Sequence, residues 1–207
     1  MKTIKHVLVG FLVLYFVFSL LGTVGLAGEQ KQELSDDQEK IMKLWKQYTS
    51  PGENHKHLEY FVGQWESIQK IWMQPGSEPI IMTQEISVES LFEGRFTRAH
   101  IKNKEEVMGI KIEAFVVTGY DNYNKRFFSV TYGNTGTNCS LMFGTLDKTG
   151  KIRKDTGEED NFFTKKKFKV RAVTTIINED KYTYESYRIG PGENEVKITE
   201  ITYSRKK

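Results

Sequence analysis

The chain has a single cysteine, Cys139, among its 207 residues, so no disulfide can form within it. Its stability must therefore come from a packed core, for which 38% of the residues are apolar. Neither a base nor an orienting partner for a catalytic thiol lies near Cys139 in the sequence. We therefore expect Cys139 to be a small, buried, apolar residue within a strand.

The chain also has little net charge. Its 30 Lys and Arg against 27 Asp and Glu give +3, and leaving out Lys2 and Lys5 with the first 27 residues gives +1. A near-neutral chain argues against nucleic acid as the main partner. The basic cluster 165–167 is local, and we interpret it as a solvated sheet edge or hairpin.

Common catalytic and cofactor motifs are missing as well. The sequence contains no Gly-x-Ser-x-Gly, Walker or Rossmann pattern. His55 and His57 would face different sides of a helix, and no further His or Cys lies close to them, which argues against a metal site. No His follows His100, although a haem-carrying barrel would need one on a late strand. We expect no cofactor.

The first 27 residues do not belong to the expected fold. A basic start precedes an apolar run from Val7 to Leu21, and the small residues Gly25 and Ala27 follow it. This is the pattern of a secretory signal peptide, and it predicts export to the periplasm or the medium. The alternative is an uncleaved membrane anchor over residues 7–27, which is just long enough to span a bilayer. No cysteine follows the run, which argues against a lipoprotein.

The remaining residues predict an all-β fold with a helical N-terminus. Apolar residues recur at helical spacing within an arm at 28–50 and again over 55–61, and from Trp65 the period changes to two. No long helix separates the strands, which excludes an α/β fold. Tight turns join about ten expected strands, which favours an up-and-down antiparallel barrel over a sandwich and makes 51–207 one domain. The expected strands are Trp65–Met73, Ile80–Leu91, Arg95–Ile101, Val107–Thr118, Arg126–Tyr132, Cys139–Leu146, Lys151–Gly157, Lys167–Ile177, Tyr182–Ile189 and Glu195–Ser204.

Gly63, Trp65 and Arg205 mark the ends of this expected sheet. A Trp at the start of the first strand can plug one end of a small barrel, and Gly63 allows a large group to approach closely. In a closed meander the last strand is its neighbour, so Arg205 could lie over the indole in a cation–π contact. The alternative is an exposed arginine in a frayed tail.

Several short motifs occur in a fixed order along the chain. They are Pro51-Gly52, His55, Leu58, Gly63-x-Trp65, Gly94-Arg95-Phe96, Thr118-Gly119-Tyr120-Asp121-Asn122 and the closing Glu200 to Lys206. Together they resemble the bacterial domain-of-unknown-function family fifteen seventy-nine, over residues 40–207. The resemblance implies a lipocalin-like, calycin-type barrel with an internal cavity and implies no reaction. Where that family has Trp and then Asp in the fifth strand, this chain has Thr131 and Gly133. If those positions line the cavity, the pocket here is larger and less acidic.

The third and fifth expected strands supply candidate cavity residues. Phe96, Arg98 and His100 share one face of the third strand, and Thr131 and Tyr132 lie in the fifth. If Phe96 points inward, the cavity gains a cation and a titratable ring, which would suit an anionic ligand head. The opposite phase would leave Arg98 and His100 on the surface.

These observations predict an exported protein that binds a small apolar or amphipathic molecule. One alternative is a hydrolase or isomerase that uses Arg98 as charge stabiliser and His100 as base. Another is an envelope interaction module whose N-terminal helix binds a partner. A membrane contact is expected only through residues 7–27, if they stay uncleaved, and the sequence leaves the oligomeric state open.

Overall fold

A computed structural model of the chain describes residues 35–161, 165–190 and 194–207. The chain divides into two compact units between Met42 and Lys43, within helix α2 (Asp36–Thr49). The second unit contains helix α3 (Glu53–Glu59) and every strand. The expected signal peptide at 1–27 lies outside the described residues, and no helix of the described part is long and apolar enough to cross a bilayer.

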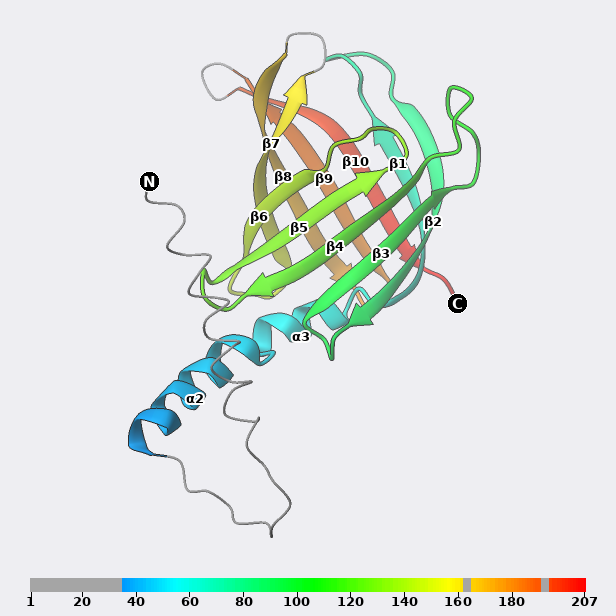
Figure 1. Ribbon diagram of the computed structural model, residues 1–207. Coiled ribbons are helices and arrows are strands. Elements are labelled where there is room, and N and C mark those ends of the chain that lie inside the picture. The colour runs from blue at the N-terminus through cyan, green and yellow to red at the C-terminus, as the bar shows by residue number, and fades with distance from the viewer. Residues whose placement is uncertain (1–34, 162–164, 191–193) are drawn as a thin grey trace. The chain divides into compact units, whose positions relative to one another are not determined.

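Ten antiparallel strands close into one barrel, which confirms the predicted fold (Figure 1). Each strand pairs with the next along the chain, and β10 pairs back with β1. Closure leaves no unpaired sheet edge. The strands are β1 (Gly63–Ile71), β2 (Ile80–Leu91), β3 (Phe96–Asn103), β4 (Glu113–Asp121), β5 (Arg126–Gly133), β6 (Ser140–Leu146), β7 (Ile152–Asn161), β8 (Lys166–Asn178), β9 (Lys181–Ile189) and β10 (Glu195–Arg205).

Two expectations about strands are wrong. The fourth strand begins at Glu113 rather than at Val107, because residues 107–110 form a tight turn with positive φ at Met108 and Gly109. Cys139 is exposed and lies just before β6, so it is not a buried strand residue.

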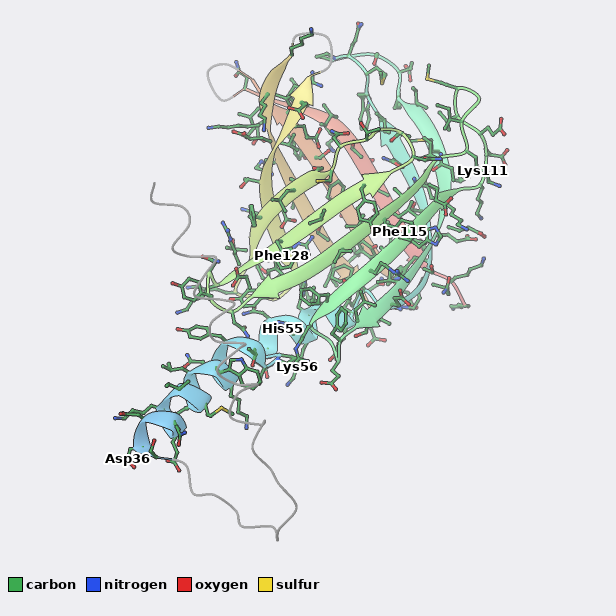
Figure 2. All side chains as sticks on the ribbon, viewed as in Figure 1. Asp36, His55, Lys56, Lys111, Phe115 and Phe128 are labelled. Atoms are coloured by element: carbon green, nitrogen blue, oxygen red, sulfur yellow. The ribbon has the colours of Figure 1, made fainter. Side chains whose placement is uncertain are left out.

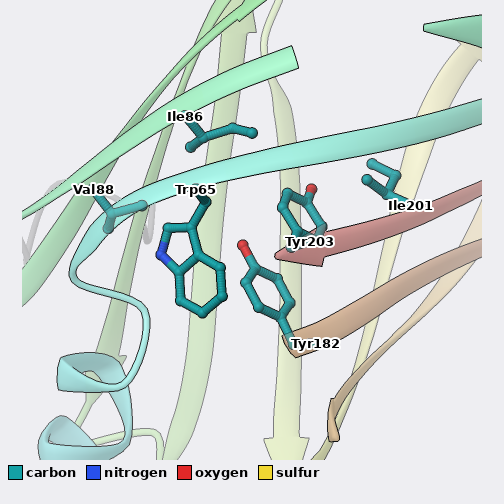
Figure 3. Close-up of a cluster of buried hydrophobic side chains, with 6 residues drawn as sticks. All are labelled: Trp65, Ile86, Val88, Tyr182, Ile201 and Tyr203. Atoms are coloured by element: carbon teal, nitrogen blue, oxygen red, sulfur yellow. The ribbon is translucent and has the colours of Figure 1, made fainter. Parts of the chain in front are cut away.

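One end of the barrel is filled by a cluster of large side chains. Trp65 is fully buried there, and its indole lies edge-on to the Tyr182 ring at 4.8 Å between centroids. Tyr182 in turn stacks on Tyr203 at 4.1 Å. Figure 3 shows these rings with the aliphatic side chains that complete the cluster, Ile86, Val88 and Ile201. Such aromatic burial contributes strongly to the stability of a barrel that has no disulfide.

Helix α3 lies across this end of the barrel (Figure 1). Its Leu58 is buried, and the Trp65 indole Nε1–H donates to the carbonyl of Phe61 at 2.8 Å. His55 is buried at the N-terminus of the helix, where its Nδ1 accepts from the Gly52 amide at 3.0 Å. The short helix therefore acts as a fixed lid over the aromatic cluster.

The C-terminal end of α2 is held by two loops of the same compact unit. The Asn122 side-chain amide donates to the carbonyls of Tyr48 and Ser50, at 3.1 and 2.9 Å. The Arg95 Nε donates to the carbonyl of Thr49 at 3.2 Å. These bonds cap carbonyl groups that the helix itself leaves without partners.

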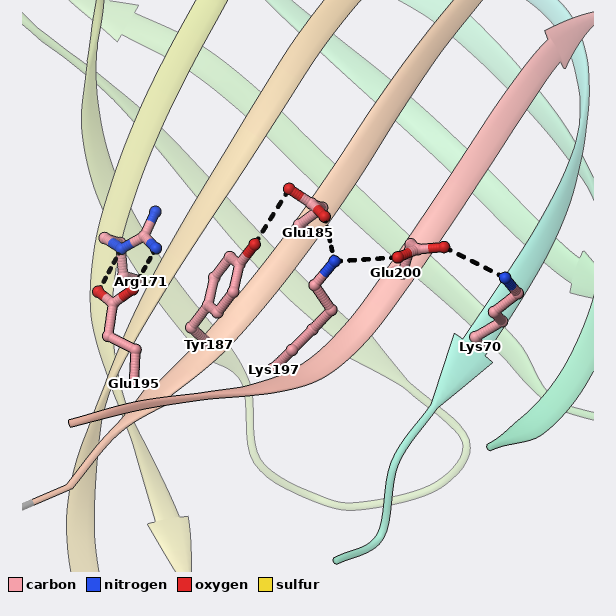
Figure 4. Close-up of polar contacts among 7 residues, drawn as sticks. All are labelled: Lys70, Arg171, Glu185, Tyr187, Glu195, Lys197 and Glu200. Carbon is pink, nitrogen blue, oxygen red and sulfur yellow. Dashed lines mark hydrogen bonds and ion pairs between the residues drawn. The ribbon is translucent and has the colours of Figure 1, made fainter. Parts of the chain in front are cut away.

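The outer face of β1, β8, β9 and β10 carries a ladder of charged side chains (Figure 4). Lys197 lies between Glu185 and Glu200, 3.0 Å from the latter, and Glu200 also pairs with Lys70 at 3.3 Å. Exposed pairs of this kind add little stability. They mark the outward-facing residues of these strands, and the alternate residues face the barrel interior.

Candidate functional site

A cavity of about 330 Å³ lies inside the barrel, within the size range of small-molecule sites. Most of its wall is apolar, and every one of the ten strands contributes at least one residue. The apolar lining includes Ile86, Ala99, Val116, Met142, Tyr184 and Ile201. The aromatic cluster under α3 forms its floor, because Phe61, Tyr182 and Tyr203 line it.

One ion pair faces this largely apolar space. Arg153 and Asp155 are two residues apart on β7, so both side chains point inward. Arg153 Nε donates to Asp155 Oδ2 at 2.9 Å, and the side chains are 11% and 2% exposed. No other residue that lines the cavity carries a formal charge, among those that the structure describes.

The two partners of this pair differ in accessibility. Asp155 Oδ1 is sealed from the cavity and accepts no hydrogen bond within the described residues. It occupies the space beside Gly144, the residue opposite it on β6, where a Cβ atom would overlap it. The two terminal nitrogens of Arg153 also bond no described group, and the Arg153 side chain keeps 11% of its surface exposed. The pair therefore presents donors to the cavity.

Tyrosine hydroxyls supply further neutral polar groups. Burial raises the pKa of Tyr184 to about 12, and the nearby carboxylates of Asp155 and Glu159 add to the rise. Burial also raises the pKa values of Tyr182 and Tyr203. All three hydroxyls therefore stay protonated at neutral pH and can donate hydrogen bonds.

A separate chain of hydrogen bonds satisfies the buried amides of the wall. Ser67 Oγ donates to Gln84 Oε1, and Gln84 Nε2 donates to Asn103 Oδ1, both at 2.9 Å. Gln84 lines the cavity, but its amide is already paired on both sides. These hydrogen bonds therefore stabilise the wall of the barrel, and the paired amides have no role in binding a ligand.

His57 lies behind the floor of the cavity. Its ring packs edge-on against Phe61 and Phe127, at 5.3 and 5.5 Å between centroids. Burial first, and then the Arg153 charge, lower the pKa of His57 to about 4, so it is neutral at pH 7. Its Nε2 is buried without a partner in the described residues.

The structure decides between the two phases that the sequence left open for β3. Thr97, Ala99 and Ile101 line the cavity, so the alternate residues Phe96, Arg98 and His100 project from the outer face. Arg98 pairs there with Glu89, and His100 pairs with Glu113 and stacks on Phe115 at 4.3 Å. Phe96 packs against Phe128 across the gap left by Gly119. The candidate residues Phe96, Arg98 and His100 therefore do not line the cavity.

The two residues predicted in β5 are separated. Thr131 lines the cavity, whereas Tyr132 is 44% exposed and stacks on Phe115 at 5.7 Å. Figure 2 labels Phe115 and Phe128, which belong to the same outer face of β4 and β5. His100, Phe115 and Tyr132 thus form one row across three strands outside the barrel.

The predicted contact between Arg205 and Trp65 is present. The guanidinium carbon lies 4.1 Å from the indole centroid, and the two residues are paired in the β1–β10 register. Arg205 also donates to the carbonyls of Val62 and Tyr60, at 3.0 and 2.8 Å. Gly63 permits this approach, because a Cβ atom there would lie 2.9 Å from Arg205 Nη1.

The sequence analysis missed Arg153 and Asp155, although β7 carries a signal for them. Its sequence, Ile-Arg-Lys-Asp-Thr-Gly-Glu-Glu-Asp-Asn, has polar residues in both phases. A strand of a closed barrel must turn one of its phases inward. Charged side chains in the interior therefore follow from this composition.

Comparisons with known proteins give a family match and a similar solved structure. The model of a family described as "Protein of unknown function (DUF1579)" matches residues 50–205. The crystal structure of Rv2717c from M. tuberculosis superimposes with a TM-score of 0.55 at 13% sequence identity, covering 76% of this chain and 100% of that chain. At this identity the likeness concerns the fold alone. No curated protein matches the chain.

Proposed function

The chain belongs to the DUF1579 family, a family of unknown function, and we propose that it binds a small amphipathic molecule inside its barrel. One observation supports the proposal: among the described residues, a largely apolar cavity of about 330 Å³ contains a single ion pair, Arg153–Asp155. Apolar walls with a few convergent polar groups are typical of ligand sites.

The cavity does not add to the stability of the fold. Unfilled volume in a core costs stability, and a barrel of modest size can be filled by its own side chains. Here small residues, Ala99 and Ala114, stand on the wall where larger ones would close the space. A ligand that occupies the space would restore the lost contacts.

The ion pair is equally poor as a stabilising element. Burying two charges costs several kcal/mol of desolvation, which their attraction often fails to repay. Arg153 and Asp155 would be replaced at little cost by an apolar pair if they had only a packing role. Their presence in an apolar wall supports a role in holding a polar group of a ligand.

The test compares two neighbouring residues of β4 that face opposite sides of the barrel. Val116 lines the cavity, and Val117, opposite Arg98 in the sheet, belongs to the outer face. We expect Val116→Trp to abolish retention of ligands from cell extract or from a panel of fatty acids and isoprenoids, as measured by native mass spectrometry. Val117→Trp is the matched control and should retain them. If the unmodified protein retains no ligand, or if both variants retain it equally, the proposal fails.

We also propose that residues 1–27 direct export of the protein, through the apolar run that begins at Val7. Cell fractionation followed by N-terminal sequencing tests this. A mature chain that begins near residue 28 indicates a cleaved signal peptide, and an intact N-terminus in the membrane fraction indicates an anchor. An intact soluble protein in the cytoplasm would contradict export.

A further inference from the structure

The charges of the cavity indicate which kind of head group the ligand carries. Building on the proposed function, we propose that the ligand is uncharged at its buried end and presents an accepting oxygen, such as a ketone or ester carbonyl, to Arg153. The proposal rests on the accessibility of the ion pair and on the charge balance of the cavity wall.

The first step is the donor edge of Arg153. Its Nε is engaged by Asp155, and its two terminal nitrogens bond no group in the described part of the chain. Arg153 lines the cavity and is 11% exposed, so these donors are open to a ligand there. Unpaired donors in an apolar space lose the hydrogen bonds that water would give them. An oxygen of a ligand that accepts from both nitrogens would recover those bonds.

The second step excludes a cationic head. The only carboxylate of the described wall is Asp155, whose Oδ2 is engaged by Arg153 and whose Oδ1 is sealed beside Gly144. A ligand ammonium group would therefore meet the Arg153 charge without reaching a counter-ion. His57, behind the floor, is neutral and offers no negative charge.

The third step disfavours an anionic head. Arg153 and Asp155 already balance each other, and no other lining residue among those described is charged. A buried carboxylate would give the cavity a net negative charge, beside the existing carboxylate of Asp155. Burying a charge without a counter-ion costs free energy. A neutral carbonyl oxygen accepts the same hydrogen bonds and carries no such cost.

The experiment uses three probes with similar alkyl chains and different heads: methyl nonyl ketone, decanoate and decylammonium. The ketone and the carboxylate have nearly the same shape. Each probe displaces the neutral fluorophore phenylnaphthylamine from the full-length protein at pH 7.5. We expect the ketone to bind about tenfold or more tightly than either ion, since the head contributes a charge-assisted hydrogen bond at no net charge.

Two variants test whether the ion pair sets this preference. Asp155→Asn leaves the Arg153 charge unbalanced and should shift the preference from the ketone toward decanoate. Arg153→Gln combined with Asp155→Asn removes both charges, keeps side chains of similar size and should weaken ketone binding about tenfold. Far-UV circular dichroism establishes that each variant is folded. If Asp155→Asn does not fold, the affinities of the wild type for the three probes and the ketone affinity of the double variant still test the inference.

The outcomes separate this inference from the proposed function. Tighter binding of decanoate or decylammonium by the wild type overturns the inference and leaves ligand binding in place. Equal binding of all three probes would show that Arg153 and Asp155 do not discriminate between the head groups. This result also overturns the inference. Failure of every probe and of phenylnaphthylamine to bind contradicts the proposed function itself.

Discussion

At the scale of single residues, Arg205 connects the last strand of the barrel to the first. Its guanidinium lies over Trp65 of β1 and donates to the carbonyls of Tyr60 and Val62, which connect α3 to that strand. Its Nε also donates to the carbonyl of Glu179, between β8 and β9. One side chain near the C-terminus therefore fixes the lid helix, the first strand and a hairpin together.

We predict that Arg205 and Trp65 are energetically coupled. Arg205→Ala should lower the free energy of unfolding by about 2–4 kcal/mol, because three backbone carbonyls lose a charged donor. In a Trp65→Phe background the same substitution should cost about 0.5–2 kcal/mol less, since part of the cation–π contact is already gone. Urea unfolding of the wild type, both single variants and the double variant measures this difference. Strictly additive losses would mean that the observed contact contributes nothing to stability.

Gly63 should tolerate no side chain. Its φ of +128° lies in a region that L-residues rarely adopt, and a Cβ atom would meet Arg205 Nη1 at 2.9 Å. We expect Gly63→Ala to destabilise the fold by about 1–3 kcal/mol. Gly52→Ala is the matched control, because nothing lies within 4 Å of a Cβ at that position and its φ is −131°. Thermal unfolding compares the two, and equal melting temperatures would contradict the strain argument.

At the scale of elements, the positions of β2 and β3 could be predicted from the sequence. Which alternate residues face the interior could be predicted for β2 but not for β3. In β2 the buried residues Met82, Ile86 and Val88 alternate with polar ones, so only one phase can face a core. In β3 both phases carry apolar groups, Phe96 on one and Ile101 on the other. Pattern alone cannot choose between two such faces, because an aromatic outer face has the same period as a core.

The composition of β7 indicates charged side chains inside the barrel, but it does not show which groups surround them. Sequence rules place charged side chains in water, and Arg153 and Asp155 violate them. The two residues pair with each other, and their surroundings come from other elements, including Gly144 on β6. Such a site depends on contacts between strands, which a single strand's composition does not contain.

The lid helix α3 should respond to pH through His57. The pKa of His57 is about 4 in the folded protein and 6.5 when exposed, so the unfolded chain binds a proton more readily. Stability from this group is complete above pH 6.5 and is lost as pH falls from 6.5 to 4, by roughly 2–3 kcal/mol. We predict that the urea midpoint of the wild type falls over this range more steeply than that of His57→Phe.

The His57→Phe variant is a fair comparison because the pocket is already aromatic, with Phe61 and Phe127 against the ring. His55, whose pKa burial also lowers, is present in both proteins and cancels in the difference. Parallel loss of stability in the two proteins over this pH range would show that protonation of His57 does not oppose folding.

At the scale of the whole molecule, the turns made the topology predictable. Ten short strands separated by tight turns allow few arrangements other than a meander, and closure follows from the need to remove edges. The cavity could not be predicted in the same way. Its volume depends on how residues of many strands, such as Ala99, Thr131 and Thr174, meet across the interior.

The barrel should need β10 to remain monomeric, whereas it should not need helix α2. Residues Trp65–Ile71 of β1 pair with β10, so a chain that ends at residue 194 exposes edges on β1 and β9. Exposed edges promote association between chains. We predict that residues 28–194 aggregate, while residues 50–207, which keep every strand, give a monomer with a β-type circular dichroism spectrum. Size-exclusion chromatography distinguishes the two results.

The effect of the exposed edges must be separated from the effect of lost core residues, because Ile201 and Tyr203 of β10 belong to the buried cluster. Ile201→Ala in the full chain removes core volume and keeps the strand. It should lower the free energy of unfolding by about 2–5 kcal/mol and leave the protein monomeric. A monomeric, β-rich 28–194 chain would show that the barrel holds together without its closing strand, and aggregation of Ile201→Ala would assign the effect to the core instead of to the edge.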